Sequence, residues 1–562
     1  MAKTYLQLNP TVNLVVLESQ ESVGGVWAEE RLYSGLRMNN EFGSYEYGDF
    51  PMDGAKYGVK KGQHIPGNVV HRYLRAYSDE YHVHPRIRFK STVTTIEKSG
   101  KKGWAIHYDT DDHPGCQIFT SKLVIATGVT SAPAIPKLRG AEDSEINVIH
   151  SKYLKTWEKK IQNSQRIAIL GGGKSAYDVA HLAASKGVEV SWIIRGSGQG
   201  AAWMVPSKVA LKKNIEELVS TRACSWMSPC VWGDAHRFQT VRWFLHGTRI
   251  GRWMVSLFWI FFANYLVRLA GYDRHPDTQK LKPWIDVFWS ANSLSVLNHP
   301  GDIFEFVRQG KIKVYISDVS HLAQHSVVLA NGQSIECDFL VCSTGWKGLP
   351  SMRFLPEGIE AEIGIVSKTA ESEILTARAD EEVLRRYPFL QKPPTARTPI
   401  TAGLNKAGVD SDVDRLNPKR VMLYRFMVPP RLTMEHNIGF AGIAAVFYSP
   451  INAQVQALWL TAYLTGQLPI SKNLSASEKE TLEWETALHN QFCKWRYPYG
   501  SKGTPDYILD ILPHMDLLLG DLGLKSHRKG SWWAECFKPY IPGDYCGLVE
   551  EWRALNAKEK VA

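Results

Sequence analysis

The chain has 562 residues, of which 44% are hydrophobic and 22% are charged. This balance excludes a disordered or fibrous protein and allows two or three globular domains. The net charge of +10 is spread along the sequence without a basic cluster, so nucleic-acid binding is not predicted. The eight cysteines include no C-x-x-C pair and no metal-ligand spacing, which indicates a reduced, intracellular protein without a metal site. The opening residues lack the apolar stretch of a signal peptide.

The first segment predicts half of a strand–helix–strand unit. Residues 1–8 predict a helix, and the apolar run Val12–Leu17 predicts a buried strand that ends beside Glu18. In such units an acid at the end of the second strand binds a ribose hydroxyl, so we assign this role to Glu18. The paired glycines Gly24 and Gly25 then allow the backbone to press against a flat ring, with Trp27 placed to stack nearby.

The strongest motif lies between residues 165 and 197. The apolar run Ile167–Leu170 predicts a buried parallel strand and leads into a G-x-G-x-x-A turn that begins at Gly171. A helix is predicted over residues 176–185, and a second strand, Val188–Ile194, ends on Arg195. This order is typical of a dinucleotide-binding unit.

Each position of the motif has a physical role. Gly171 makes the tight turn, Gly173 lets the backbone approach a pyrophosphate, and Ala176 lets the helix pack closely on the strand. Lys174 and Ser175 lie at the helix N-terminus, which attracts phosphate groups. An NAD site carries an acid where this chain has Arg195, and a guanidinium suits the 2′-phosphate of NADP.

A tryptophan-rich block follows the second strand, over about residues 203–300. It contains eight of the 19 tryptophans. The enrichment suits an apolar substrate cavity, a membrane-surface contact, or an ordinary helical insertion with an aromatic core. Its longest apolar run, residues 254–267, is shorter than the roughly 20 residues that span a bilayer. The run predicts a buried helix, with a peripheral membrane contact as the alternative.

Five further stretches carry a family resemblance. Residues 18–27 fit E-x(5)-G-G-x-W, and residues 36–39 and 49–51 fit L-R-x-N and D-F-P. The stretches ending in Ala126-Thr127-Gly128 and in Thr344-Gly345 resemble two crossovers between domains, and residues 439–459 resemble a late flavin-facing segment. Together, in this order, they resemble the flavin-containing monooxygenases and their Baeyer–Villiger and N-hydroxylating relatives.

The resemblance implies an α/β fold with two Rossmann-like, three-layer dinucleotide-binding domains. The expected divisions are residues 1–155 for the first part of an FAD-binding domain, 156–345 for an NADP-binding domain with a helical insertion at about 203–300, and 346–562 for the second FAD-binding part with a helical C-terminal region. FAD would contact Glu18, Gly24, Gly25, Val26, Trp27, Ala126, Thr127, Gly128, Ile451 and Asn452. NADPH would contact Gly171, Gly173, Lys174, Ser175, Ala176, Arg195, Thr344 and Gly345.

Two catalytic candidates follow from the same resemblance. Asn39 matches the family asparagine that hydrogen-bonds the oxygen carried by the flavin. His150 is what survives of a worn F-x-G-x(3)-H-x(3)-[YW] linker motif, in which Leu154 occupies the last aromatic position. A second departure is the family's Gly-rich FAD turn, which would precede the helix at residues 1–8. Either the sequence starts late or the chain does not bind FAD, and we favour a late start.

The predicted function is an FAD-dependent, NADPH-using monooxygenase that inserts one oxygen atom of O2 into an apolar small molecule by hydroxylation, epoxidation or Baeyer–Villiger oxidation. A role in secondary metabolism is a hypothesis, as is a cytoplasmic or peripherally membrane-associated location. The oligomeric state does not follow from the sequence. One alternative is a non-catalytic NADP-binding remnant. Another is a flavin-dependent oxidoreductase without oxygenation, against which the missing redox cysteine pair counts.

Overall fold

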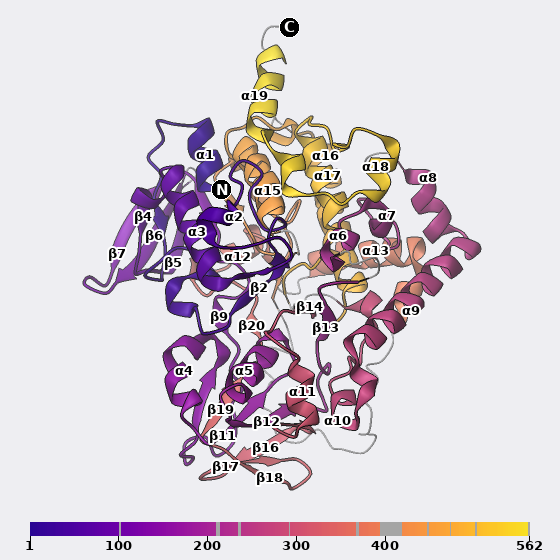
Figure 1. Cartoon of the computed structure of the whole chain (residues 1–562). Helices are drawn as coiled ribbons and strands as arrows, with labels where there is room; N and C mark the ends of the chain where they lie inside the picture. The colour runs from indigo at the N-terminus through magenta and orange to yellow at the C-terminus, as the bar shows by residue number, and fades with distance from the viewer. Residues whose placement is uncertain are drawn as a thin grey trace.

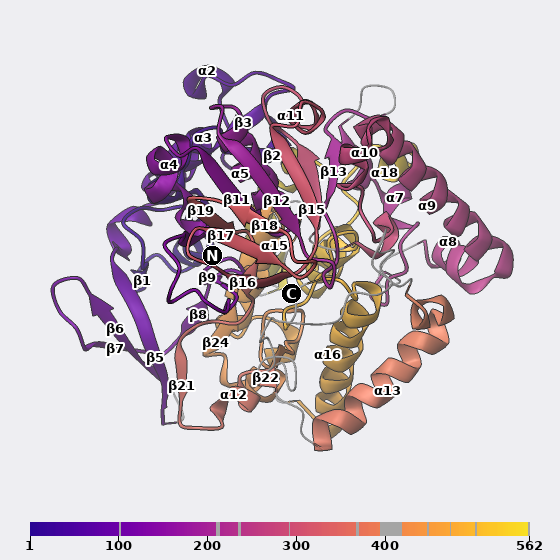
Figure 2. The same ribbon diagram turned by 90° about the horizontal axis from the view of Figure 1, so that it is seen from below.

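The computed structural model describes residues 1–100, 103–209, 214–233, 238–290, 293–366, 370–393, 419–444, 446, 449–471, 474–500 and 503–559. Figure 1 shows a parallel sheet with its helices in the lower half of the molecule, and mixed strands and long helices in the upper half. Seen from below, the parallel sheet lies near the centre, with helices α8 and α9 along one flank (Figure 2).

The lower half is built on five parallel strands. Their spatial order is β10 (Asn147–His150), β19 (Phe339–Cys342), β11 (Arg166–Leu170), β12 (Glu189–Ile194) and β15 (Ile312–Ile316). Ile167 and Ile169 of β11 join the core under helices α4 (Leu154–Gln162) and α5 (Lys174–Ala184). Ala168 and Leu170 face the other side, against the antiparallel strands β16 (Val319–Leu322), β17 (Ser326–Leu329) and β18 (Ser334–Glu336). Burial on both faces explains the continuous apolar runs of these strands.

The predicted strand–turn–helix–strand unit is present with small shifts at its ends. The helix begins at Lys174 instead of residue 176, because Gly173 has an extended conformation and forms the N-cap. The second strand begins at Glu189 and ends, as expected, just before Arg195. The local pattern therefore predicted the whole unit correctly.

Between β12 and β15 the chain leaves the parallel sheet. The insertion opens with β13 (Trp203–Pro206), which pairs in parallel with β14 (Leu294–Leu297). The helices of this stretch are α6 (Ile215–Val219), α7 (Arg222–Ser225), α8 (Gln239–Arg242), α9 (Arg249–Ala270), α10 (Pro276–Gln279) and α11 (Ile303–Arg308). Helix α9 is longer than the apolar run at residues 254–267 that predicted it, and one of its faces is exposed, so the expectation of a buried helix was wrong.

The upper half contains several small sheets. The largest has the order β21-β5-β6-β7, with bounds Arg353–Leu355, Ser91–Ser99, Gly103–Thr110 and Cys116–Thr120. Strand β1 is only Val16–Leu17 and pairs in parallel with β4 (Ile87–Arg88). The strand predicted over residues 12–17 was therefore too long, because β4 is the one strand that pairs with it among the described residues. Strands β8 (Leu123–Ile125) and β24 (Ile438–Phe440) form another parallel pair.

Two connections link the halves and run side by side. Strand β9 (Ala132–Pro133) pairs antiparallel with β20 (Trp346–Lys347), so both predicted crossovers meet at one place. Strand β2 (Arg37–Glu41) pairs with β3 (His64–Pro66), which precedes helix α3 (Gly67–Glu80).

Helices cover the rest of the upper half. They are α1 (Ala2–Leu8), α2 (Gly54–Tyr57), α12 (Ile359–Glu362), α13 (Ala370–Arg386), α15 (Ser449–Leu464), α16 (Ala476–Arg496), α17 (Ile511–Asp521), α18 (Trp532–Phe537) and α19 (Leu548–Glu559). Helices α15 and α17 are almost wholly buried. The C-terminal region is thus helical as predicted, but α17 is an apolar core helix.

Candidate active site

A cleft of about 220 Å³ lies where the two halves meet. Residues from both halves line it: Val26, Trp27, Arg31, Tyr33, Leu36, Arg37, Asn39, Ser151, Lys152, Leu154, Lys174, Ser175 and Asp178. Five predicted site residues, Val26, Trp27, Asn39, Lys174 and Ser175, therefore share one cavity. The other predicted residues are not among those that line it.

The glycine turn has the geometry that close approach by a ligand requires. Gly171 has a φ of +130°, and a Cβ added there would lie 2.2 Å from the Ser343 carbonyl oxygen, so only glycine is tolerated. A Cβ added at Gly173 would meet no atom within 4 Å, so the backbone at this residue faces open space. Ala176 is fully buried against the sheet. A pyrophosphate would fit against the open side of this turn.

Arg195 is half-buried at the carboxyl end of β12. No hydrogen bond or ion pair to its guanidinium is seen among the described residues. A guanidinium free of protein partners beside the glycine turn is placed to bind a phosphate group.

Asp178 is the centre of a polar cluster in the cleft that sequence analysis missed. Its carboxylate accepts hydrogen bonds from Tyr33 (3.0 Å) and from His299 Nε2 (2.8 Å), and it forms an ion pair with Lys174. Burial alone would raise the pKa of Asp178, but Lys174 and His299 outweigh it and hold this pKa below its usual value. Burial and the Asp178 charge raise the pKa of Tyr33 well above its ordinary value. Asp178 is therefore an ionised anchor for the start of α5.

Cationic side chains dominate the cleft. Arg31, Arg37, Lys152 and Lys174 face it, whereas its one acid, Asp178, is already paired. Burial lowers the pKa of Arg31, whose guanidinium also lies 5.3 Å from the centre of the Trp346 ring. A cleft with this charge favours a polyanionic ligand such as a dinucleotide.

The side chain of Asn39 is held by the insertion. Ser295 Oγ lies 3.3 Å from Asn39 Oδ1, and Asn298 Nδ2 lies 3.5 Å from the same atom. Asn298 Nδ2 also donates to the carbonyl oxygens of Arg37 and Met38, each at 3.0 Å. Because both donors approach the amide oxygen, the side-chain N–H groups of Asn39, a residue that lines the cleft, remain available to donate to a ligand.

A second contact holds the other end of β2. Glu216 of α6 is buried, and its carboxylate accepts hydrogen bonds from Ser44 Oγ (2.9 Å), from the Asn40 side chain and from the Glu41 backbone N–H. Burial raises the pKa of Glu216 from 4.5 to about 7. Lys208 Nζ binds Glu41 Oε2 at 2.7 Å. The insertion therefore contacts β2 on both sides of Asn39.

His150 does not line the cleft. Its Nε2 donates to the Gly345 carbonyl oxygen at 3.0 Å, and its Nδ1 accepts the Lys152 backbone N–H at 3.0 Å. Burial lowers the pKa of the ring, which is consistent with a neutral imidazole. Its ring also packs against Trp346, with 5.0 Å between centroids. In this structure His150 therefore packs the end of β10 against the second crossover.

The N-terminal residues predicted to bind FAD form a turn at the cleft entrance. Gly24 and Gly25 have φ values of +119° and +59° and lead into the short 3₁₀ helix Gly25–Trp27. Glu18 follows β1, where its carboxylate accepts the Gln20 backbone N–H at 2.9 Å. Ala126, Thr127 and Gly128 follow β8, and Ala126 and Thr127 are exposed. All of these residues lie at carboxyl ends of parallel strands or in the turn that follows, as in other nucleotide-binding sheets.

Helix α15 connects the early and late motifs. Gln454 accepts the Gly48 backbone N–H at 3.0 Å and donates to Asp49 at 3.2 Å, so the predicted D-F-P stretch lies against this helix. Ile451 and Asn452 are buried, and among the described residues the Asn452 Oδ1 atom has no hydrogen-bond partner. An orphaned buried oxygen at the helix start fits a polar ligand such as a flavin.

The second crossover is fixed by backbone contacts. Thr344 Oγ1 donates to the Ala134 carbonyl oxygen at 2.5 Å, and Gly345 has a φ of +89°. The carbonyl oxygen of Gly345 also accepts the Ala134 backbone N–H at 3.0 Å. These contacts join the second crossover to the first at Ala134.

The cysteines offer no dithiol centre. None of the eight, which all lie within the described residues, forms a disulfide bond, and burial raises the pKa of both Cys337 and Cys342 to about 12. Within the described residues no group of His, Cys, Asp and Glu side chains could hold a metal ion. A flavin–dithiol oxidoreductase is therefore disfavoured.

Known proteins resemble this chain over its whole length. FAD-dependent monooxygenase resA of Aspergillus sclerotiorum is 32% identical over 586 aligned residues, covering 100% of this chain and 97% of the relative. An FAD-dependent monooxygenase of Pyrenophora dematioidea is 33% identical and covers 94% and 96%. The chain belongs to this family of FAD-dependent monooxygenases. Family membership confirms the predicted resemblance and the enzyme class, a flavoprotein oxidoreductase.

Two other comparisons concern the monooxygenase fold. The model of the pyridine nucleotide-disulphide oxidoreductases matches residues 15–225. The structure of cyclohexanone monooxygenase from Rhodococcus sp. Phi1 bound to NADP⁺ superposes with a TM-score of 0.56 at 16% identity, covering 93% of this chain and 94% of that one. These likenesses confirm the α/β fold class.

Sequence analysis missed four residues in or near the cleft of the monooxygenase. Asp178 had a local signal, because it lies one helical turn after Lys174 on the same face. His299, Asn298 and Glu216 had none, since each contacts a segment more than a hundred residues away in the chain. Only the folded insertion brings them to the site.

Proposed function

We propose that the chain transfers one oxygen atom from O2 to an apolar small molecule, with FAD as cofactor and NADPH as reductant. Bound FAD would accept the hydride and react with O2. The observation that carries the proposal is that Asn39 and the start of α5, at Lys174 and Ser175, line one cationic cleft between the two halves. NADPH could then lie between them.

Each predicted site residue would have a role that follows from its position. Gly171, Gly173 and Ser175 would hold the pyrophosphate of NADPH at the start of α5, and Arg195 would bind its 2′-phosphate. Gly24, Gly25 and Trp27 would lie along the flavin, and Ile451 and Asn452 would face its ring. Asn39 would donate a hydrogen bond to the reacting oxygen. The buried tryptophans of the insertion, such as Trp203 and Trp284, would exclude water and receive the apolar substrate. The fungal relatives support a role in secondary metabolism.

The visible absorption spectrum of the purified chain tests this proposal. We expect a bound-flavin spectrum that bleaches with NADPH in the absence of O2 and recovers when air is admitted. The Asn39→Ala variant should keep the spectrum and the bleaching step but release more H2O2 per NADPH. If the protein remains colourless after FAD is added, the proposal is wrong, and the chain is the non-catalytic NADP-binding remnant.

We further propose that the enzyme is intracellular and makes a peripheral membrane contact through residues 254–267. Helix α9 is long and apolar enough by length and composition to cross a membrane, and only 17% of an 18-residue stretch within it is buried. Val255, Trp259 and Leu266 nevertheless pack into the protein, so the helix would lie along a membrane surface. Replacing Ile260 and Phe261 with serine should abolish co-flotation with lipid vesicles.

A further inference from the structure

The outward face of α9 is largely apolar. Ile250, Trp253, Met254, Ile260, Phe261 and Tyr265 are exposed, and they recur at the spacing of one helical face. Trp253 is 62% exposed and Phe261 is 69% exposed. The turn before the helix adds Trp243 and Phe244. Large apolar side chains that are exposed together mark an interaction surface.

Helix α18 repeats this pattern at the other end of the sequence. Trp532, Trp533 and Phe537 are exposed, whereas Glu535 and Cys536 on its inner side are buried. Helices α18, α8 and α9 lie on the same flank of the molecule in both views (Figures 1 and 2). We call the exposed side chains of α9, its preceding turn and α18 the aromatic flank.

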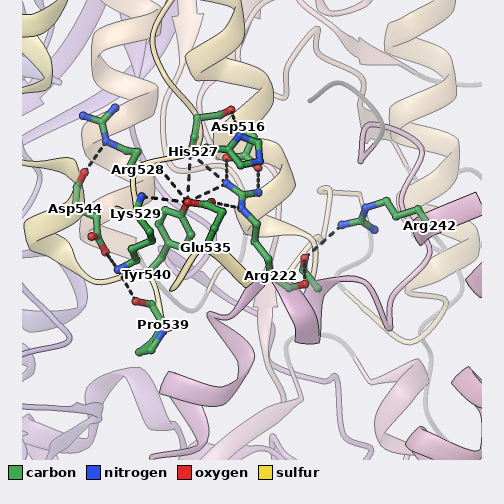
Figure 3. A network of polar contacts seen from close by, with 12 residues as sticks. Arg222, Arg242, Asp516, His527, Arg528, Lys529, Glu535, Pro539, Tyr540 and Asp544 are labelled. Atoms are coloured by element: carbon green, nitrogen blue, oxygen red, sulfur yellow. Dashed lines mark hydrogen bonds and ion pairs between the residues drawn. The ribbon is translucent and has the colours of Figure 1, made fainter. Parts of the chain in front are cut away.

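A buried ionic network holds α18 in this orientation. Arg222 of α7 forms ion pairs with Asp516 of α17 and Glu535 of α18 (Figure 3). Its Nη2 also donates to the Tyr540 hydroxyl at 3.0 Å. Because each buried charge is paired, loss of one partner would be costly. Glu535 is thereby directed inward, and its neighbours Trp532 and Trp533 are directed outward.

Within the two segments that carry the aromatic flank, the exposed charges are cationic. Residues 239–270 contain four arginines and no acid. Arg249 and Arg268 are exposed at the two ends of α9. Residues 522–541 contain a single acid, Glu535, which is buried and paired with Arg222, while Lys525 and Lys538 are exposed. An apolar stripe edged by exposed cations is complementary to a bilayer surface with anionic headgroups.

We propose that α9 and α18 together form one docking platform on an anionic lipid bilayer. The inference rests on the membrane contact proposed above for residues 254–267 and extends it to a second, distant segment of the chain. Tryptophan and tyrosine rings would lie at headgroup depth, with the arginines and lysines at the lipid phosphates. Two contact segments fix how the protein sits on the surface, which one helix cannot do.

Flotation of the FAD-loaded full chain with vesicles tests the platform. The vesicles are phosphatidylcholine alone, or phosphatidylcholine with about 30% phosphatidylserine. The variants are Ile260→Ser/Phe261→Ser in α9 and Trp532→Ser/Trp533→Ser in α18. Phe119→Ser is the matched control, because Phe119 is 66% exposed on β7, on the opposite side of the molecule.

We expect the wild type and the control to float with anionic vesicles and less with neutral ones. Each double variant should weaken vesicle binding at least about tenfold, because two large apolar side chains no longer enter the bilayer. A tenfold change corresponds to about 1.4 kcal/mol of binding free energy. If the α18 variant binds like the wild type while the α9 variant does not, the platform is wrong and the contact through α9 stands.

Two other outcomes would overturn the platform. If the wild type floats with neither vesicle, both membrane proposals fail, and NADPH-dependent O2 consumption of the same preparation shows whether the oxygenase proposal survives. The second outcome is a dimer, which sedimentation equilibrium would detect. A dimer that Trp532→Ser/Trp533→Ser converts to a monomer would mean that a second copy covers this flank.

Discussion

Asn39 has a defined amide orientation because Ser295 and Asn298 both approach its Oδ1 atom. The identity of the residue could be predicted from the L-R-x-N motif. Its orientation could not, since Asn298 follows it by 259 residues in the chain. The same holds for Glu216, which binds the segment after Asn39 from the insertion. At the scale of single residues, the sequence identifies candidates, and the fold decides which way their donors point.

Replacing Asn298 with aspartate should uncouple the enzyme. A carboxylate would repel the Asn39 oxygen and the Arg37 and Met38 carbonyls, so the amide would turn away from the cleft. Loss of one such hydrogen bond is worth roughly 1–2 kcal/mol, so H2O2 release per NADPH should rise about tenfold. The flavin spectrum should be retained. Asn331→Asp, in an exposed turn, is the control.

A double-mutant cycle makes this prediction specific. In an Asn39→Ala background, Asn298→Asp should add nothing further to H2O2 release, because the group that it orients is gone. Additive effects of the two changes would show that Asn298 acts elsewhere.

Arg195→Ala should raise the KM for NADPH about ten- to a hundredfold and leave the KM for NADH almost unchanged. Only the 2′-phosphate distinguishes the two cofactors, and only that group loses its partner. Steady-state kinetics with both cofactors measure the effect. Equal changes for NADPH and NADH would show that another side chain reads the phosphate.

Glu216→Gln should change how stability depends on pH. The folded-state pKa of about 7 lies above the ordinary value of 4.5. The carboxyl group therefore favours folding below about pH 4.5, and this contribution is lost as the pH rises through 7. Wild-type stability should fall over this range by roughly 2–3 kcal/mol more than that of the variant. Identical pH profiles in chemical unfolding would contradict the assignment.

At the scale of elements, local sequence patterns correctly predicted the helices, strands and turns that local interactions determine. The strand Arg166–Leu170, the glycine turn and helix α5 follow from apolar runs and from a turn that needs a positive φ. Strand β1 is shorter than predicted because strand length depends on pairing, and pairing is not local. The exposed face of α9 was missed for a related reason, since periodicity cannot tell which face a neighbour covers.

Two glycine substitutions distinguish the structural role of Gly171 from the binding role of Gly173. Gly171→Ala should destabilise the protein by roughly 2–4 kcal/mol, because its φ is +130° and the new Cβ would overlap the Ser343 carbonyl. Gly173→Ala should leave thermal unfolding almost unchanged, since its Cβ meets open space, but should weaken NADP⁺ binding. Calorimetric titration measures the second effect. Equal destabilisation by both changes would refute this division of roles.

At the scale of the whole molecule, contacts between distant segments assemble the enzyme. The insertion supplies Asn298 and Glu216 to the cleft, and the C-terminal region supplies Asp516 and Glu535 to Arg222. These contacts join α7 to helices about 300 residues later in the chain. The network thus connects the insertion with the C-terminal helices.

Arg222→Met should destabilise the folded chain by roughly 3–5 kcal/mol, because it leaves two buried carboxylates without their cation. Chemical unfolding measures the change. Lys90→Met is the control, since the pairs of Lys90 with Glu21 and Asp111 lie at the surface and are worth little. A similar loss in both variants would mean that burial of the Arg222 network is unimportant.

The sequence by itself determined the dinucleotide-binding unit, the order of the family motifs and therefore the enzyme class. The unit and each single motif are continuous stretches of sequence, where backbone geometry and hydrophobic period set the structure. Tertiary structure alone decided that Asp178 is held by Tyr33 and His299, that Ser295 and Asn298 contact the Asn39 amide oxygen, and that α9 exposes its apolar face. The physical reason is that a side chain's partners and its exposure depend on segments that only the folded chain brings together.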